Sequence, residues 1–162
     1  TVPIGAVPIS LANFVICLTA WLLGPKFGTL SVVIYLVLGA IGIPVFSGYG
    51  AGLAKLAGPT GGYLVGYLLL AFIGGMFIEK SKGNPVVSAV GLVLGDAACY
   101  VLGTAWFVFQ MQCELGYALT VCVYPFIALD LAKIVVSCIV GALLRKRLTQ
   151  AGVLKLQNAV SE

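Results

Sequence analysis

The sequence contains no histidine, and charged residues make up only 9% of it. Histidine is the commonest metal ligand and general base, and the chain also lacks an HExxH helix and a GxSxG nucleophile elbow. An enzyme would have to work with Asp96, Asp130 and Lys133 alone, so we expect a protein that is not an enzyme. The five cysteines show no CxxC spacing, which predicts buried free thiols. We expect no metal, no cofactor and no nucleic acid among its ligands.

The low charge goes with a high apolar content, which predicts an all-α integral membrane protein. Soluble domains carry about 25% charged residues, whereas this chain is 61% hydrophobic, with a mean hydropathy of +1.14. Glycine, proline or charged residues separate five apolar runs, at 11–23, 29–46, 62–78, 86–109 and 121–144. The runs predict five spans, of which the first is short. We expect a membrane-embedded domain over 1–144 and a basic tail over 145–162.

The charged residues predict how these spans are oriented. Alternating five spans places seven cations on one side of the membrane: Lys26, Lys80, Lys82, Arg145, Lys146, Arg147 and Lys155. Lys55 is the only cation on the other side. Because basic loops stay in the cytoplasm, we expect a multi-pass protein of the cell membrane with a cytoplasmic C-terminus. No basic stretch precedes the first apolar run, and the start TVPIGAVPIS leads us to expect a missing upstream segment.

Three irregular segments fall on the external side in this arrangement. They are the start with Pro3 and Pro8, the glycine-rich loop 47–62, and the helix break at Tyr124–Pro125. Non-helical backbone at membrane depth survives only where protein buries it or where it lines a wet cavity. These segments therefore predict a pocket that opens outward.

Asp130 and Lys133 interrupt the last apolar run. They lie three residues apart, hence on one helix face, and each charge costs about 2.5 to 3.5 kcal/mol at the bilayer centre. Asp130 suits a ligand with N–H donors, and Lys133 suits a carbonyl or carboxylate. A salt bridge to another span is the alternative. Asp96, one turn before Tyr100, either lines the cavity or bonds to a neighbouring helix.

The glycine-rich loop is the second candidate ligand-binding element. Its glycines allow main-chain N–H and C=O groups to approach a polar ligand, although a flexible connector has the same composition. Thr60 precedes the third span, where it either caps the helix or contacts an anion. The loop is not a nucleotide-binding loop, because no GxxxxGK[ST] occurs in the chain.

Taken together, five segments in order resemble the BioY family, the biotin-specific substrate-capture (S) components of energy-coupling-factor transporters. The segments are VPIS at 7–10, LLGPKFGTLS at 22–31, GIPVFSGYGAG at 42–52, GPTGGYL at 58–64 and PFIALDLAK at 125–133. The resemblance implies a compact six-helix bundle whose first helix is absent from this chain. It also implies biotin uptake through an outward-facing pocket, together with a transmembrane coupling subunit and two separate ATPase subunits that use ATP.

The resemblance also implies which residues bind biotin. Asp130 and Lys133 would hold its polar groups, while the loop 47–52 and the GPTGG turn close over it. The expected site comprises Asp130, Lys133, Ser47, Gly48, Tyr49, Gly50, Thr60, Gly61 and Tyr100. The ureido ring offers two N–H donors and a carbonyl, and the valerate chain ends in a carboxylate, which match an acceptor, a cation and bare backbone groups. Membrane lipid is the remaining expected partner.

The chain departs from the family pattern at a few positions. Leu129 stands where relatives usually have glycine, Ala12 and Asn13 stand near a usual glutamine, and Tyr49 replaces a smaller residue. The docking motif lies on the absent first helix, so docking residues are not assigned. An S component for a different vitamin and a structural membrane protein without transport activity remain the alternatives.

Overall fold

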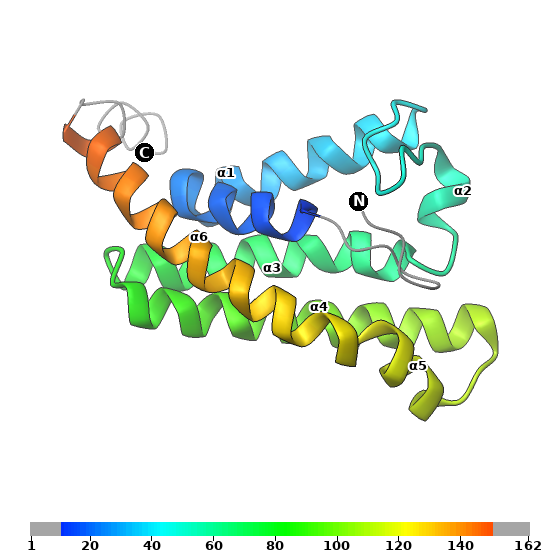
Figure 1. The fold of residues 1–162 in the computed structure, drawn as a ribbon. Coiled ribbons are helices and arrows are strands. Elements are labelled where there is room, and N and C mark those ends of the chain that lie inside the picture. The colour runs from blue at the N-terminus through cyan, green and yellow to red at the C-terminus, as the bar shows by residue number, and fades with distance from the viewer. Residues whose placement is uncertain (1–10, 151–162) are drawn as a thin grey trace.

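The computed structural model describes residues 11–150, and every regular element in that range is a helix (Figure 1). The helices are α1 (Ala12–Ala40), α2 (Leu53–Leu56), α3 (Gly61–Lys80), α4 (Pro85–Met111), α5 (Leu115–Cys122) and α6 (Tyr124–Gln150). By length and composition α1, α3, α4 and α6 can cross a membrane, so the predicted all-α class is confirmed. Pro3, Pro8, the segment 7–10, Lys155 and the tail beyond 150 lie outside the described residues.

Helix α1 consists of two arms that meet at Gly24. Its backbone there is non-helical, with φ 71° and ψ −172°, a conformation that glycine tolerates and other residues avoid. The chain folds back at this point (Figure 1), and a Cβ added to Gly28 would lie 3.5 Å from the Cα of Ala20. The first two predicted spans correspond to these arms, but the second arm ends at Ala40 rather than at residue 46.

The last apolar run is also divided, at Val123. Residues 115–122 form α5, and α6 begins at Tyr124. Pro125 therefore occupies the first turn of α6, where a missing N–H costs no intrahelical bond. The predicted break ahead of Asp130 is confirmed, whereas helical structure already starts at Leu115, before the predicted start of the last run at residue 121.

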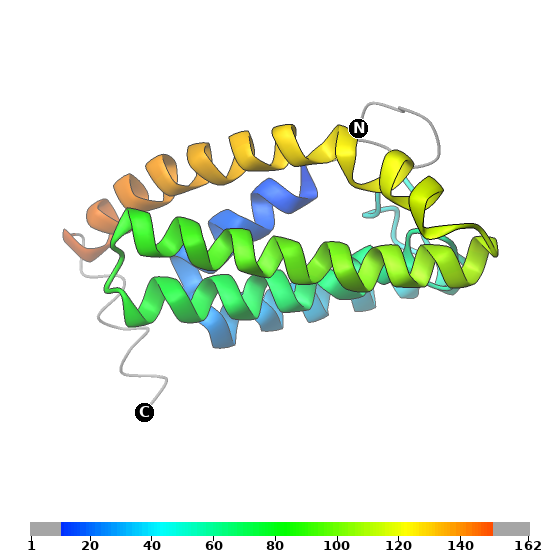
Figure 2. The same cartoon turned by 90° about the horizontal axis from the view of Figure 1, so that it is seen from below.

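Helices α3 and α4 lie side by side along the length of the molecule (Figure 2). Glycines let their backbones approach closely: a Cβ added to Gly95 would lie 3.0 Å from the Cα of Leu70, and one added to Gly66 would lie 3.0 Å from the Cα of Cys99. Small residues drive such packing in membranes, where burial of apolar surface contributes little. This close pair is the frame against which α1 and α6 pack.

Basic residues gather at one end of the bundle. The bend of α1, the turn between α3 and α4 and the end of α6 meet there (Figure 1). A Cβ on Gly24 would lie 3.6 Å from Glu79, and one on Gly83 would lie 3.8 Å from Arg145. The turns and helix ends at this end carry Lys26, Lys80, Lys82, Arg145, Lys146 and Arg147. The loop 41–52, α2 and α5 lie at the opposite end (Figure 1).

Candidate functional site

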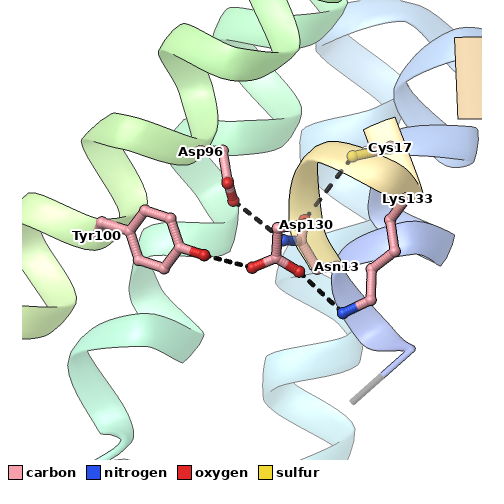
Figure 3. A network of polar contacts seen from close by, with 6 residues as sticks. All are labelled: Asn13, Cys17, Asp96, Tyr100, Asp130 and Lys133. Atoms are coloured by element: carbon pink, nitrogen blue, oxygen red, sulfur yellow. Dashed lines mark hydrogen bonds and ion pairs between the residues drawn. The ribbon is translucent and has the colours of Figure 1, made fainter. Parts of the chain in front are cut away.

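The ionisable pair of α6, a buried Asp130 and a partly buried Lys133, is joined to α4 through a tyrosine. Lys133 Nζ lies 2.8 Å from Asp130 Oδ1, and the Tyr100 hydroxyl donates to Asp130 Oδ2 at 2.5 Å (Figure 3). Only 6% of Asp130 is exposed. The ion pair lies within one helix, so it is not itself a bridge between spans; the link from α6 to α4 is the Tyr100 hydrogen bond.

A second polar contact joins α1 to α4 beside this pair. Asn13 Nδ2 donates to Asp96 Oδ1 at 3.0 Å, and the Cys17 thiol donates to Asn13 Oδ1 at 3.7 Å (Figure 3). Asn13, Cys17 and Asp96 are all buried. Asp96 thus bonds to a neighbouring helix and also lines the cavity described next, so both roles considered for it from the sequence hold.

These groups border a cavity of about 80 Å³ between the helices. Its charged and polar lining consists of Asn13, Ser47, Lys55, Thr60, Asp96, Asp130 and Lys133. Its aromatic and apolar lining consists of Phe46, Tyr63, Leu64, Tyr67, Cys99, Tyr100, Cys122 and Phe126. Two carboxylates, two ammonium groups and an aromatic wall suit an amphipathic ligand with several hydrogen-bonding groups.

Five of the nine site residues expected from the sequence line this cavity. They are Asp130, Lys133, Ser47, Thr60 and Tyr100. Thr60 is the residue before α3, but its side chain makes no capping hydrogen bond, so the expected cap interaction is wrong. Thr60 instead lines the cavity.

The other four expected residues are not among those that line the cavity. Gly48 and Gly50 belong to the loop between α1 and α2, and the side chain of Tyr49 is 87% exposed. Gly61 is the first residue of α3 and packs against the end of α2. A Cβ there would lie 1.6 Å from the carbonyl oxygen of Leu56, so the position requires glycine. A role for these four in ligand binding stays a prediction.

Apart from Tyr100, the aromatic residues of the lining were not assigned to the site from the sequence, and neither were Asn13 and Lys55. The wall residues Tyr63, Tyr67 and Phe126 sit in apolar helices, where nothing in their spacing separates them from core residues. Lys55 did carry a signal, because it is the only lysine or arginine in the external loops predicted from the sequence. This isolated positive charge could have identified Lys55 as a site residue.

The loop 41–52 is fixed above the cavity by Phe46. The Phe46 ring lies over Gly39, whose added Cβ would be 2.0 Å from the ring, and it makes an edge-to-face contact with Tyr35 at a centroid distance of 5.4 Å. Within the loop, Phe46 N–H donates to Gly50 O at 3.1 Å, while Gly52 N–H donates to Gly39 O at 2.7 Å. Phe46 is therefore the buried anchor of a loop whose residues 41–45, 48 and 49 are exposed.

Comparison with known proteins decides the family. A model of the BioY family matches residues 1–150. The chain belongs to the BioY family. It is 40% identical over 146 residues to "Biotin transporter BioY" of Thermotoga maritima, covering 90% of this chain and 85% of that protein. It is 37% identical over 141 residues to "Probable biotin transporter BioY" of Pyrococcus horikoshii, covering 87% and 82%.

A solved structure shows the same fold. A crystal structure of the S-component for biotin from an energy-coupling-factor-type ABC transporter superposes with a TM-score of 0.83 at 36% identity. The match covers 90% of this chain and 80% of the other. The resemblance drawn from the ordered segments is thereby confirmed, as is the expectation of a multi-pass membrane protein of a transporter family rather than an enzyme.

Proposed function

We propose that this chain captures biotin in the cavity between the helices and serves as the substrate-binding subunit of an energy-coupling-factor transporter. The observation that carries the proposal is the Asp130–Lys133 ion pair on the cavity wall, with Tyr100 bonded to the second carboxylate oxygen. Relatives named as biotin transporters and the solved biotin S-component support the choice of ligand. A separate coupling subunit and two ATPase subunits would supply the energy from ATP.

The proposed orientation places the cavity end outside and the basic end in the cytoplasm. Basic residues at the bend of α1, the α3–α4 turn and the end of α6 support it, because such residues are retained in the cytoplasm. The C-terminus would then be cytoplasmic, and biotin would enter past the loop 41–52. Ser47, Gly48, Tyr49, Gly50, Thr60 and Gly61 would contact the ligand as the loop and the GPTGG turn enclose it.

The test is equilibrium binding of biotin to the detergent-purified chain and to Asp130→Asn. We expect saturable binding by the unchanged protein and an affinity at least about tenfold lower for the variant, because Asp130 would lose its role as a charged acceptor. Glu114→Gln is the matched control: it makes the same chemical change at an exposed residue of the same end. Gel filtration verifies that each protein is folded.

Competition and melting curves separate the alternatives. Riboflavin and thiamine, added in excess, should not displace biotin; displacement by either would assign the chain to another vitamin. Biotin should raise the melting temperature of the unchanged protein and raise it less in Asp130→Asn. If Asp130→Asn melts at a lower temperature but shows the same biotin-induced shift as the unchanged protein, the Asp130–Lys133 pair is structural. That result would overturn its assignment to the biotin site.

A further inference from the structure

Lys55 is a second cation of the cavity, and neighbouring residues hold its side chain in place. It lies on α2, is partly buried, and lines the same cavity as Asp130 and Lys133. A Cβ added to Gly50 would lie 3.1, 3.3 and 3.4 Å from three carbons of the Lys55 side chain. The aliphatic part of the Lys55 side chain therefore packs against Gly50. Any larger residue at position 50 would displace this side chain.

The short helix that carries Lys55 is held from α4. Trp106 Nε1 donates to Gly58 O at 2.9 Å, and Gln110 Nε2 donates to Ala57 O. Both acceptors lie within three residues of Lys55, so α4 fixes the end of α2 while Gly50 fixes the path of the side chain. Lys55 is thus placed by contacts on both sides.

The two lysines of the cavity differ in their charge partners. Lys133 Nζ is 2.8 Å from a carboxylate oxygen of Asp130, whereas Lys55 forms no ion pair among residues 11–150. A neutral polar group with both donors and an acceptor can bond to the Asp130–Lys133 pair without adding charge. A carboxylate placed there would meet the negative charge of Asp130, while beside Lys55 it would meet a cation with no carboxylate partner.

We propose that Lys55 binds the carboxylate of the ligand, and that the Asp130–Lys133 pair binds its neutral ring. The inference rests on the proposed function, because it assumes that biotin occupies the cavity. Asp130 lies six residues into α6, about 9 Å along the helix axis, whereas Lys55 belongs to the loop region at the cavity end. The valerate chain would extend from the buried pair towards α2, past the aromatic wall. Lys55 makes the site select a free acid over its ester or amide.

The test compares biotin with biotin methyl ester, which keeps the ring and loses the negative charge. Dissociation constants are measured by calorimetry on the detergent-purified full chain and on Lys55→Gln. We expect the variant to lose about five- to twentyfold in affinity for biotin and to bind the ester as the unchanged protein does. Lys55→Arg keeps the charge and should retain the preference for the free acid. Lys26 is an exposed lysine at the opposite end, and Lys26→Gln should leave the affinities for both ligands unchanged.

Other results overturn the inference. An equal loss of affinity for acid and ester would make Lys55 a structural residue, and no loss at all would remove it from the site. Loss of the preference in Lys133→Met with its retention in Lys55→Gln would place the carboxylate at Lys133. If the unchanged protein binds neither biotin nor the ester, the proposed function itself is wrong. This outcome is distinct from those above, in which the unchanged protein binds biotin and only the role of Lys55 is refuted.

Discussion

Asn13 is the residue through which α1 reaches the buried carboxylate of α4. Its side-chain amide donates to Asp96 at 3.0 Å and accepts from the thiol of Cys17, so both polar ends of the amide are used. A buried carboxylate that loses a hydrogen-bond donor is destabilised. The pairing of Asn13 with Asp96 therefore stabilises the contact between the two helices.

The strength of this contact can be measured by a double-mutant cycle. Asn13→Ala should lower the free energy of unfolding by about 1 to 3 kcal/mol, because Asp96 is left without its donor. Unfolding in detergent is followed by circular dichroism for Asn13→Ala, Asp96→Ala and the double variant. The double variant should cost less than the sum of the two single changes. Strict additivity would show that the two side chains do not interact.

At this scale the sequence predicted the charged residues of the site better than the uncharged ones. Asp130 and Lys133 stand out because an ionised group in an apolar run is costly. Tyr63 and Tyr67 do not, because a tyrosine in a membrane helix has the same local pattern whether it faces a cavity or a neighbouring helix. Asn13 and Asp96 are 83 residues apart, and only the packing of α1 on α4 joins them.

The bend of α1 packs closely against α3 at Gly75. A Cβ added to Gly75 of α3 would lie 2.7 Å from the Cα and N of Pro25 and 2.9 Å from the carbonyl carbon of Gly24. These neighbours are backbone atoms, which cannot move away as the end of a side chain can. The fold-back of α1 therefore needs a residue without a side chain on α3.

This requirement predicts opposite effects for two glycine-to-alanine changes. Gly75→Ala should lower the free energy of unfolding by about 1 to 3 kcal/mol, because the added methyl group pushes α1 away from α3. Gly116→Ala is the control: nothing lies within 4 Å of its added Cβ, and the higher helix propensity of alanine should stabilise α5 by up to about 1 kcal/mol. Thermal melting in detergent compares them. Equal effects of the two changes would refute close packing at Gly75.

The sequence predicted helix boundaries well where glycine or proline determines them, and poorly where packing against the rest of the fold determines them. The break at Gly24–Pro25 and the break before Asp130 follow from glycine and proline. The small helices α2 and α5 do not. They have four and eight residues, and such short helices form only through contacts with the rest of the fold. The sequence accordingly indicated loops where these two helices stand.

For the whole molecule, the gathering of six basic residues at the end opposite the loop 41–52 predicts which end faces the outside. Tyr49→Cys, in the exposed loop at the cavity end, should react on intact cells with a maleimide that cannot cross the membrane. Lys80→Cys, at the basic end, should react only after the cells are permeabilised. The parent for both is Cys113→Ser, since the other four cysteines are buried; this parent should stay unlabelled. The reverse pattern would invert the proposed topology.

The arrangement of the whole bundle followed from charge and apolar length, but its site did not. Five apolar runs and one-sided basic loops were enough to predict an all-α membrane protein and to bring six of the cations together at one end. The cavity is lined by residues of all six helices, from distant parts of the chain, and the mutual rotation of these helices depends on glycine contacts such as Gly66 of α3 with Cys99 of α4. No local pattern specifies that rotation.

The two acidic and two basic side chains around the cavity have an electrical consequence for transport. The formal charges of Asp96, Asp130, Lys55 and Lys133 sum to zero, so an anionic ligand adds one net negative charge to the site. Moving one charge across a membrane potential of 100 mV involves about 2.3 kcal/mol. The potential of a cell is negative inside, so inward movement of the loaded site is electrogenic and opposed by it. The driving force for uptake must therefore exceed this electrical work.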